Sequence, residues 1–545
     1  MKILFVVPKF NFTKKLSITK KNYNYVFPIG MGYIISVLKK AKYDVDCINL
    51  NHIEGHTKEI IIEKLNNEKY DFVCIGNMSD GYSLTEIVLK AVKEHPTHPK
   101  TILGGLIITS EHEMVFKALK PDFGILGEGE ETIVELLNAL FNKKDISHIK
   151  GLIYKKDNNI IFTGKREDFE NINSLPFPDL EAMGIAEYLD NMHPNFWGAH
   201  LLNVVDYPRP YPILGSRSCP FNCTFCGHIS KYRQRSIDNI MKELEENVEK
   251  LKINLVFLYD DCFTLDLNRV YEFCERMKKL QKKVGWELKW GTNMTVKQVT
   301  PELLKTMKDA GCYSLGFGFE SFDKNVLKSM RKPVTPEEID TALRYSRGIG
   351  MMIYAGFIFG DVAETKESAK RTLDYWVSIQ KQGLGFIGLG FIQPFPGTAI
   401  YQHCLKKGII KDKLEFLKNV ESMNGFEINM TDDMSNEELK ELEKIIRDLY
   451  AKHKTFITPQ KIIKTGKNIY NIKVSCPFCK KELEYKNNFI VNKLSFGFIT
   501  ICRNCGSGFW ITSPLQKFAY KHYGVSGNIK KYINKLKSSL GKKTA

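Results

Sequence analysis

The chain has 545 residues, which is too long for a single hydrophobic core and indicates three or four modules. Its thirteen cysteines are an odd number, and seven of them fall in two tight clusters. This usage argues against a disulfide framework and predicts metal binding in a reducing compartment. Because the apolar run at 2–7 is too short for a signal-peptide core and no apolar run has membrane-spanning length, we expect a cytoplasmic protein.

The net charge of +17 is unevenly distributed along the chain. Residues 461–545 contain seventeen lysines and arginines but two glutamates, so this segment carries +15 and the first 460 residues carry +2. A near-neutral body therefore ends in a basic module, where an anionic partner would bind. A solvated lysine-rich tail is the alternative.

The first 145 residues alternate strand-like apolar runs with helical patterns. Strands are expected at 2–7, 45–50, 72–76 and 101–103, with a helix at about 32–40. This alternation predicts an α/β fold with a doubly wound, Rossmann-like parallel sheet, which binds cofactors at the carboxyl ends of its strands. Glycines in the loops at those ends would allow close backbone approach. The candidate cofactor-binding positions there are Gly30, Gly104, Gly105, Gly127, Glu128 and Gly129.

Residues 146–206 are predicted to form a connector with a short hairpin at 151–162 and a proline-rich bridge. From 207 to 400, strands are expected near 255–258, 286–290, 313–318, 353–359 and 387–392, alternating with amphipathic helices such as 237–250 and 301–310. This pattern predicts a partial (β/α)6 TIM-like barrel with its chemistry at the carboxyl ends of the strands. A helical extension is expected at 401–465.

Cys219, Cys223 and Cys226 follow the first barrel strand with Cys-x3-Cys-x2-Cys spacing. Three thiolates can hold three corners of a four-iron cluster and leave one iron open to an outside ligand. The alternative is a structural zinc site that His228 completes as Cys3His.

This spacing, with Phe225 between the last two cysteines, resembles the signature of the radical S-adenosylmethionine (SAM) enzymes. The resemblance implies that the three cysteines hold a [4Fe-4S] cluster and that Phe225 and Gly227 lie beside the cofactors. In that family the open iron chelates SAM, which is cleaved to a 5′-deoxyadenosyl radical. It also implies an electron donor such as a flavodoxin or ferredoxin.

Acidic residues follow two of the predicted barrel strands. Asp260 and Asp261 come after 255–258, and Glu320 and Ser321 come after 313–318. In the radical SAM family, the group after the second strand meets the SAM ammonium and a polar residue after the fourth meets its ribose or methionine end. Carboxylates suit both because they accept hydrogen bonds and oppose positive charge. Capping of the next helix by Asp260 or Asp261 is the alternative.

The N-terminal succession Pro-x-Gly-x-Gly-Tyr, Gly-Gly and Gly-Glu-Gly-Glu resembles the cobalamin-binding domain that precedes the barrel in the class B branch of that family. Cobalamin is thus implied as a further cofactor. The segment has no Asp-x-His-x-x-Gly motif, so cobalamin should bind with its lower ligand detached. The alternative is a Rossmann-like domain that has lost its cofactor.

A second cysteine cluster lies in the C-terminal module at 466–515. Cys476 and Cys479 form one Cys-x2-Cys pair, and Cys502 and Cys505 form the other. Four thiolates in this arrangement satisfy tetrahedral zinc, which predicts a structural zinc ribbon. The ligands alone do not distinguish zinc from a rubredoxin-like iron or an auxiliary iron-sulfur cluster.

The last segment, 516–545, is basic, and residues 528–540 have the pattern of an amphipathic helix with a lysine-rich face. Such a helix fits contact with an anionic membrane surface, or packing on the ribbon, better than nucleic acid, because interleaved aromatics and arginines are missing. The six isolated cysteines are expected to be core thiols. They are Cys47, Cys74, Cys262, Cys274, Cys312 and Cys404.

We therefore expect a radical SAM enzyme that methylates an unactivated carbon of a small-molecule, peptide or lipid substrate with the help of cobalamin. A first alternative is a radical SAM cyclase or carbon-carbon coupling enzyme with an empty cobalamin domain. A second, of another class, is a tRNA-modifying or RNA-binding protein that acts through the basic C-terminal ribbon.

Overall fold

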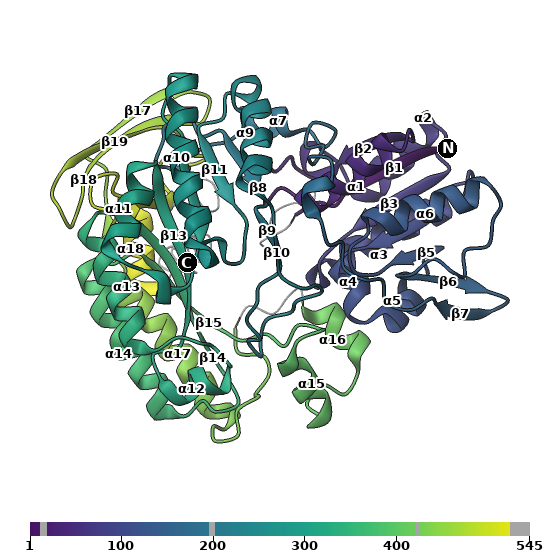
Figure 1. Ribbon diagram of the computed structural model, residues 1–545. Helices are drawn as coiled ribbons and strands as arrows, with labels where there is room; N and C mark the ends of the chain where they lie inside the picture. The colour runs from purple at the N-terminus through teal and green to yellow at the C-terminus, as the bar shows by residue number, and fades with distance from the viewer. Residues whose placement is uncertain (11–18, 196–201, 421–424, 524–545) are drawn as a thin grey trace, which may run out of the picture.

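The computed structural model describes residues 1–10, 19–195, 202–420 and 425–523. An N-terminal α/β domain, a barrel-like α/β domain and a C-terminal β ribbon follow one another along the chain (Figure 1). A single cluster of buried apolar side chains extends across the first two parts. None of the described helices is long and apolar enough to cross a membrane. The helix expected at 528–540 lies outside the described residues.

The N-terminal sheet has seven strands in the order β2-β1-β3-β4-β5-β6-β7. The first five in this order are parallel, as predicted, whereas β6 and β7 are antiparallel and extend the sheet at its edge. The strands are β1 (Lys2–Val7), β2 (Asp44–Asn49), β3 (Phe72–Gly76), β4 (Lys100–Gly104), β5 (Phe123–Ile125), β6 (Leu152–Lys156) and β7 (Asn159–Phe162). The helices are α1 (Ile29–Lys40), α2 (Thr57–Asn67), α3 (Tyr82–Glu94), α4 (Leu106–Ser110), α5 (His112–Leu119) and α6 (Glu130–Phe141).

A short helix, α7 (Ile185–Asp190), precedes the second sheet, which has six parallel strands in the order β8-β11-β12-β13-β14-β15. Because β8 and β15 do not pair, this barrel is open on one side. The strands are β8 (Pro210–Ile213), β11 (Leu255–Leu258), β12 (Lys289–Asn293), β13 (Cys312–Glu320), β14 (Met352–Phe359) and β15 (Phe386–Phe391). The intervening helices are α9 (Ile237–Leu251), α10 (Leu267–Val284), α11 (Pro301–Asp309), α12 (Lys324–Ser329), α13 (Pro336–Gly348) and α14 (Lys366–Gln382).

One predicted barrel strand is displaced along the chain. The sequence places it at 286–290, but β12 runs from Lys289 to Asn293. The preceding helix α10 ends at Val284, and its C-cap Gly285 turns the chain with a φ of +76°. The Trp286 indole then donates a hydrogen bond of 2.8 Å to the Ile253 carbonyl. Gly285 and Trp286 therefore belong to the turn before the strand, and the strand begins later than its apolar pattern suggests.

The chain then forms a helical extension that returns to the N-terminal domain. It contains α15 (Ala399–Lys406), α16 (Lys413–Val420) and α17 (Asn436–His453). Helix α16 packs against α3 and α5, so the extension joins the barrel to the first sheet (Figure 1).

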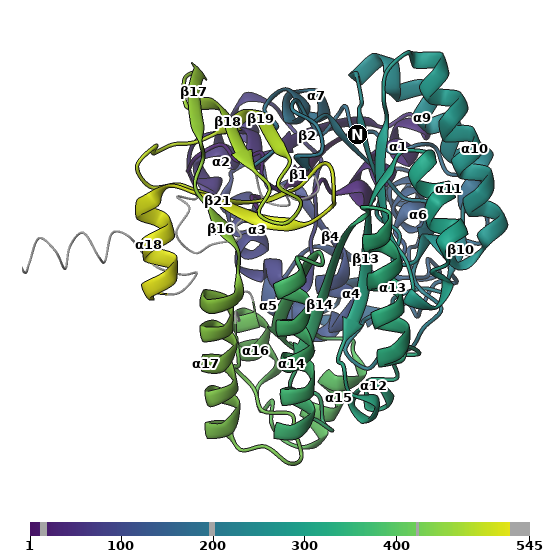
Figure 2. The same ribbon diagram turned by 90° about the vertical axis from the view of Figure 1, so that its left-hand side faces the viewer.

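The ribbon consists of two three-stranded sheets beyond the end of α17 (Figure 2). One has the order β16-β21-β20 and the other β17-β18-β19, and a small apolar core of its own lies between them. Its elements are β16 (Phe456–Ile457), β17 (Lys461–Gly466), β18 (Ile469–Ser475), β19 (Glu482–Phe489), β20 (Gly497–Ile501), β21 (Gly508–Thr512) and helix α18 (Pro514–Tyr523).

Candidate active site

The loop with the first three cysteines closes on itself at its base. Strand β9 (Ser216–Arg217) pairs antiparallel with β10 (Arg233–Gln234). Inside the loop, the Thr224 amide donates to the Met330 carbonyl at 3.0 Å, and the Thr224 carbonyl accepts from the Ile400 amide at 2.9 Å. The chain therefore holds the loop from two sides.

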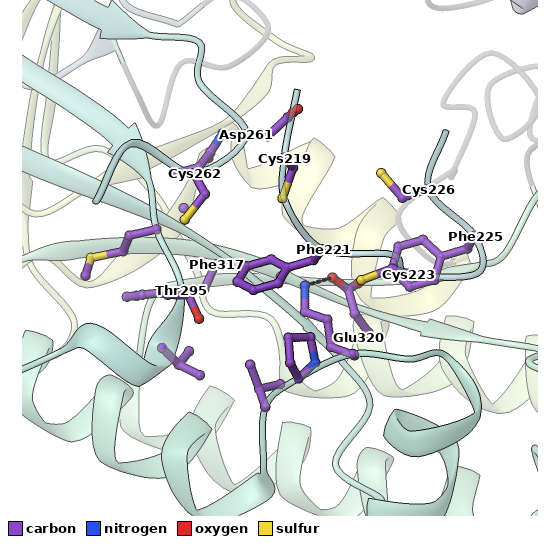
Figure 3. A pocket seen from close by; sticks show the side chains of 18 of the residues that line it. Cys219, Phe221, Cys223, Phe225, Cys226, Asp261, Cys262, Thr295, Phe317 and Glu320 are labelled. Carbon is purple, nitrogen blue, oxygen red and sulfur yellow. Dashed lines mark hydrogen bonds and ion pairs between the residues drawn. The ribbon is translucent and has the colours of Figure 1, made fainter. Parts of the chain in front are cut away.

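Cys219, Cys223 and Cys226 line one cavity of about 260 Å³ at the carboxyl ends of the barrel strands (Figure 3). The rings of Phe221, Phe225 and Phe317 supply apolar walls. Such walls restrict the access of water to anything bound beside the cysteines.

The cysteine side chains suit a cluster better than a single ion. Burial raises the pKa of the Cys226 thiol to about 11, so loading a metal there must displace a proton. Among the described residues, the cysteines at 476–505 form a compact group of possible metal ligands. The sulfur atoms of the three loop cysteines lie farther apart than those of that group. Thiols spread around a cavity fit a polynuclear iron-sulfur group rather than one zinc ion completed by His228.

The two neighbouring aspartates after β11 have different surroundings. Asp261 lines the cavity, and burial raises the pKa of its carboxyl group. Asp260 is fully buried behind the wall, where its carboxylate accepts hydrogen bonds of 2.6 Å from the Gly215 amide and the Ser216 hydroxyl. The structure thus brings Asp261 to the cavity and uses Asp260 to anchor the base of the cysteine loop.

The side chains of Glu320 and Ser321 also have different surroundings. Glu320 lies in the cavity wall with a left-handed φ of 62°, and its carboxylate pairs with the Lys332 ammonium at 2.9 Å (Figure 3). Burial alone would lower the pKa of Lys332, but the nearby Glu320 carboxylate stabilises the ammonium more strongly, so the pKa is raised. The Ser321 hydroxyl instead lies 3.3 Å from that of Thr372, away from the cavity. Gly227 packs against the methyl group of Thr398.

Sequence reasoning missed several residues of this cavity, among them Asn293, Lys332 and Tyr354. Asn293 ends β12, and its side-chain oxygen accepts a hydrogen bond of 2.6 Å from the Tyr354 hydroxyl. The rule that polar groups cluster at strand ends would have found Asn293 had the strand been placed correctly. Lys332 follows α12 and carries no such signal. Cys262, expected as a core thiol, is buried but borders the cavity.

The glycines predicted to contact a cofactor in the first domain fall into two groups. At Gly30, Gly104 and Gly127, no atom lies within 4 Å of the position that a Cβ would take. Gly30 is the second residue of α1, Gly104 is the last residue of β4, and Gly127 follows β5. All three lie at the carboxyl ends of the parallel strands, so they leave room there for a large ligand such as a corrin. Gly105, with φ +88°, packs against the Asn77 carbonyl, and Gly129 precedes α6 against apolar side chains.

Glu128, predicted at the same edge, is engaged with arginines of the barrel. Its carboxylate accepts hydrogen bonds of 2.8 and 2.6 Å from Arg233 and forms an ion pair of 3.2 Å with Arg217. Burial opposes this charge, but the arginines lower the pKa of Glu128. The carboxylate therefore joins the first domain to the base of the cysteine loop.

The second cysteine cluster is compact. The sulfur atoms of Cys476, Cys479, Cys502 and Cys505 all lie within 4.8 Å of one another. The Cys502 sulfur accepts from the Cys505 amide at 3.5 Å, and the Cys479 sulfur accepts from the Asn504 side chain at 3.6 Å. Such donors stabilise thiolates, and four thiolates in this geometry can hold one tetrahedral metal ion.

Comparison with known proteins agrees with both domains. The radical SAM superfamily model matches residues 213–375, and the B12 binding domain model matches residues 17–137. An uncharacterized methyltransferase of Pyrococcus horikoshii is 24% identical over 70% of this chain and 79% of its own. The anaerobic magnesium-protoporphyrin IX monomethyl ester cyclase of Cereibacter sphaeroides is 28% identical over 63% of this chain and 55% of its own.

Among solved structures, the radical SAM methyltransferase TsrM from Kitasatospora setae, with cobalamin and [4Fe-4S] cluster bound, has a similar fold. The TM-score is 0.59 at 16% identity, and the match covers 74% of this chain and 78% of that one. The fold, the cysteine cavity and the matched models define a radical SAM enzyme. The B12 binding domain ahead of the barrel assigns it to the class B, cobalamin-binding branch of that superfamily. Its cofactors are accordingly a [4Fe-4S] cluster, SAM and cobalamin.

Proposed function

We propose that this enzyme methylates an unactivated carbon of its substrate, with Cys219, Cys223 and Cys226 holding the cluster. The observation that carries the proposal is the single cavity shared by these cysteines at the carboxyl ends of the barrel strands. When bound, the cluster supplies the electron that cleaves SAM, and cobalamin supplies the methyl group.

Two acidic side chains in the cavity wall would orient SAM. Asp261 would accept hydrogen bonds from its ammonium group, and Glu320, held by Lys332, from its ribose or methionine end. Gly30, Gly104 and Gly127 would let the backbone approach cobalamin at the edge of the first sheet. The substrate would lie between that edge and the barrel mouth.

The setting of the enzyme follows from its chemistry. None of the thirteen cysteines forms a disulfide, which supports a reducing, cytoplasmic location. A small electron-transfer protein such as a flavodoxin or ferredoxin would reduce the cluster. Zinc is our assignment for the C-terminal cysteine site.

Two measurements test the proposal. First, anaerobic reconstitution with iron and sulfide should give the wild type a four-iron cluster with broad visible absorbance. Cys223→Ala should lose this absorbance, whereas Cys274→Ala, a buried cysteine of α10, should keep it. An unchanged spectrum in Cys223→Ala would contradict the cluster assignment.

Second, the reduced enzyme with SAM, hydroxocobalamin and fractions of host extract should form both 5′-deoxyadenosine and S-adenosylhomocysteine, detected by mass spectrometry. Formation of 5′-deoxyadenosine without S-adenosylhomocysteine would indicate that the enzyme cyclises or couples its substrate and does not methylate it. A protein that retains no corrinoid after cobalamin loading and dialysis would also exclude methyl transfer.

A further inference from the structure

A second cavity, of about 300 Å³, lies where the barrel is open. Its lining comes from β14 and β15, from the ends of α14 and α17, and from the ribbon. The ribbon contacts the barrel closely, since a Cβ on Gly508 would lie 2.5 Å from the Phe386 ring of β15. The ribbon therefore covers the side that the six strands leave unpaired.

This cavity borders the cysteine cavity. Tyr354 of β14 lines both. Beside it, the strands carry glycines, and at Gly356 and Gly390 no atom lies within 4 Å of the place of a Cβ. At Gly388 the nearest atom is the Ala355 carbonyl oxygen at 3.8 Å. These glycines leave open space along β14 and β15 beside Tyr354.

The lining of the second cavity combines aromatic rings with one positive charge. Among the described residues that line it, Lys454 is the charged one. Its ammonium lies 4.0 Å from the ring centre of Tyr450 and 5.0 Å from that of Trp510. Within the part of the chain that the structure describes, no carboxylate is paired with it. Burial lowers its pKa to about 8, because the ammonium loses hydration.

The second cysteine cluster builds the opposite wall. Phe478, between Cys476 and Cys479, lines the cavity, and its ring lies where a Cβ on Gly383 would be. Gly508 and Phe509, shortly after Cys505, line it as well. A metal ion at the four cysteines would therefore hold the aromatic wall that faces Lys454.

We propose that Lys454 binds the acidic group of the substrate, which is accordingly an anion with an apolar or aromatic body. The body would lie among the rings of the second cavity and extend past Tyr354, so that a carbon of the substrate reaches the cysteine cavity. This inference rests on the proposed function, because it names the class of substrate for that site. An ammonium without a counter-ion, on aromatic rings, gains most from an anion that also covers those rings.

The test uses the full-length, cluster-reconstituted protein without reductant and three probes of one shape: naphthoate, naphthyl phosphate and naphthalenemethanol. Binding is measured by isothermal titration calorimetry. We expect at least one of the two anions to bind the wild type, and to bind at least tenfold more weakly to Lys454→Met. Lys454→Arg should restore much of the affinity. The matched control is Lys452→Met, which changes an exposed lysine two residues earlier, in the last turn of α17, and should bind like the wild type.

The two anions distinguish a carboxylate from a phosphate as the preferred group. The proposal is overturned if neither anion binds the wild type, if Lys454→Met binds them equally well, or if the neutral alcohol binds as tightly. Circular dichroism of each variant checks the fold. Because no reductant is present, this binding experiment does not depend on methyl transfer. Failure of the proposed anion site would therefore leave the proposed methylation standing, and failure of the methylation would leave the anion site standing.

Discussion

Arg217 forms an ion pair with Glu130, the first residue of α6, and so connects the cysteine loop to the N-terminal domain. Its side chain is 13% exposed and that of Glu130 is 7% exposed, so water screens the pair weakly. Arg217 stands two residues before Cys219, and the same guanidinium also reaches Glu128. The Gly-Glu-Gly-Glu motif thus joins the two domains as well as shaping a loop at the sheet edge.

Replacing Arg217 should therefore destabilise the protein. Arg217→Gln leaves the buried Glu130 carboxylate without its partner and leaves Glu128 paired with Arg233 alone, and we expect it to lower the free energy of unfolding by about 3 kcal/mol. Urea denaturation followed by circular dichroism measures this. The control is Arg166→Gln, because Arg166 pairs with Glu131 and Glu135 of the same helix, both 48% exposed. It should cost less than about 1 kcal/mol, and equal losses in the two variants would refute the distinction.

The ion pair of Glu320 with Lys332 should control SAM binding. Lys332→Met leaves the Glu320 carboxylate in the cavity wall without its ion-pair partner, so that the carboxylate loses its orientation. We expect SAM affinity to fall by about tenfold, corresponding to about 1.4 kcal/mol. Calorimetric titration of the reconstituted protein with SAM measures it. Lys324→Met removes an exposed ion pair with Glu337 and should change nothing; a wild-type affinity in Lys332→Met would show that the pair is dispensable.

Glu364 should make the stability depend on pH. The side chain is 1% exposed, and burial raises its pKa to about 8 from the usual 4.5. Between about pH 5 and pH 8 the unfolded chain is ionised at this position while the folded protein keeps the proton, so the free energy of unfolding falls by about 1.4 kcal/mol per pH unit.

Thermal unfolding over that pH range tests the effect. Glu364→Gln keeps a neutral side chain of the same shape and should flatten the decline of the melting temperature relative to the wild type. If both proteins decline in parallel, Glu364 does not hold a proton in the folded state.

The C-terminal cysteines should bind metal independently of the loop cysteines. Metal analysis should find about one zinc ion per chain in Cys223→Ala and none in Cys502→Ala, because tetrahedral zinc needs all four thiolates. Limited proteolysis should then cleave the ribbon of Cys502→Ala first, since its small core depends on the metal. Iron in place of zinc would favour the rubredoxin-like alternative.

Much of the fold follows from local patterns. Strands β1, β3 and β11 have the bounds that the apolar runs predict, because buried parallel strands are nearly continuous apolar segments. The apolar pattern places β12 too early, because the side chain of Trp286 packs in a turn and not in the sheet. That displacement hid Asn293 from the predicted site.

The kind of chemistry can be predicted from local sequence spacing. The spacing of Cys219, Cys223 and Cys226 and the two Cys-x2-Cys pairs are local, and ligands that lie close along the chain must lie close in space.

The roles of the remaining groups depend on how the chain folds in three dimensions. Asp261 faces the cavity while Asp260 is buried behind it, because adjacent residues point to different sides of the backbone. The pairing of Lys332 with Glu320, the reach of Glu128 to Arg217 and the placement of Lys454 among aromatic rings join elements that no sequence pattern links. Such contacts depend on how the domains pack. Their residues lie far apart along the chain, so no local sequence pattern predicts them.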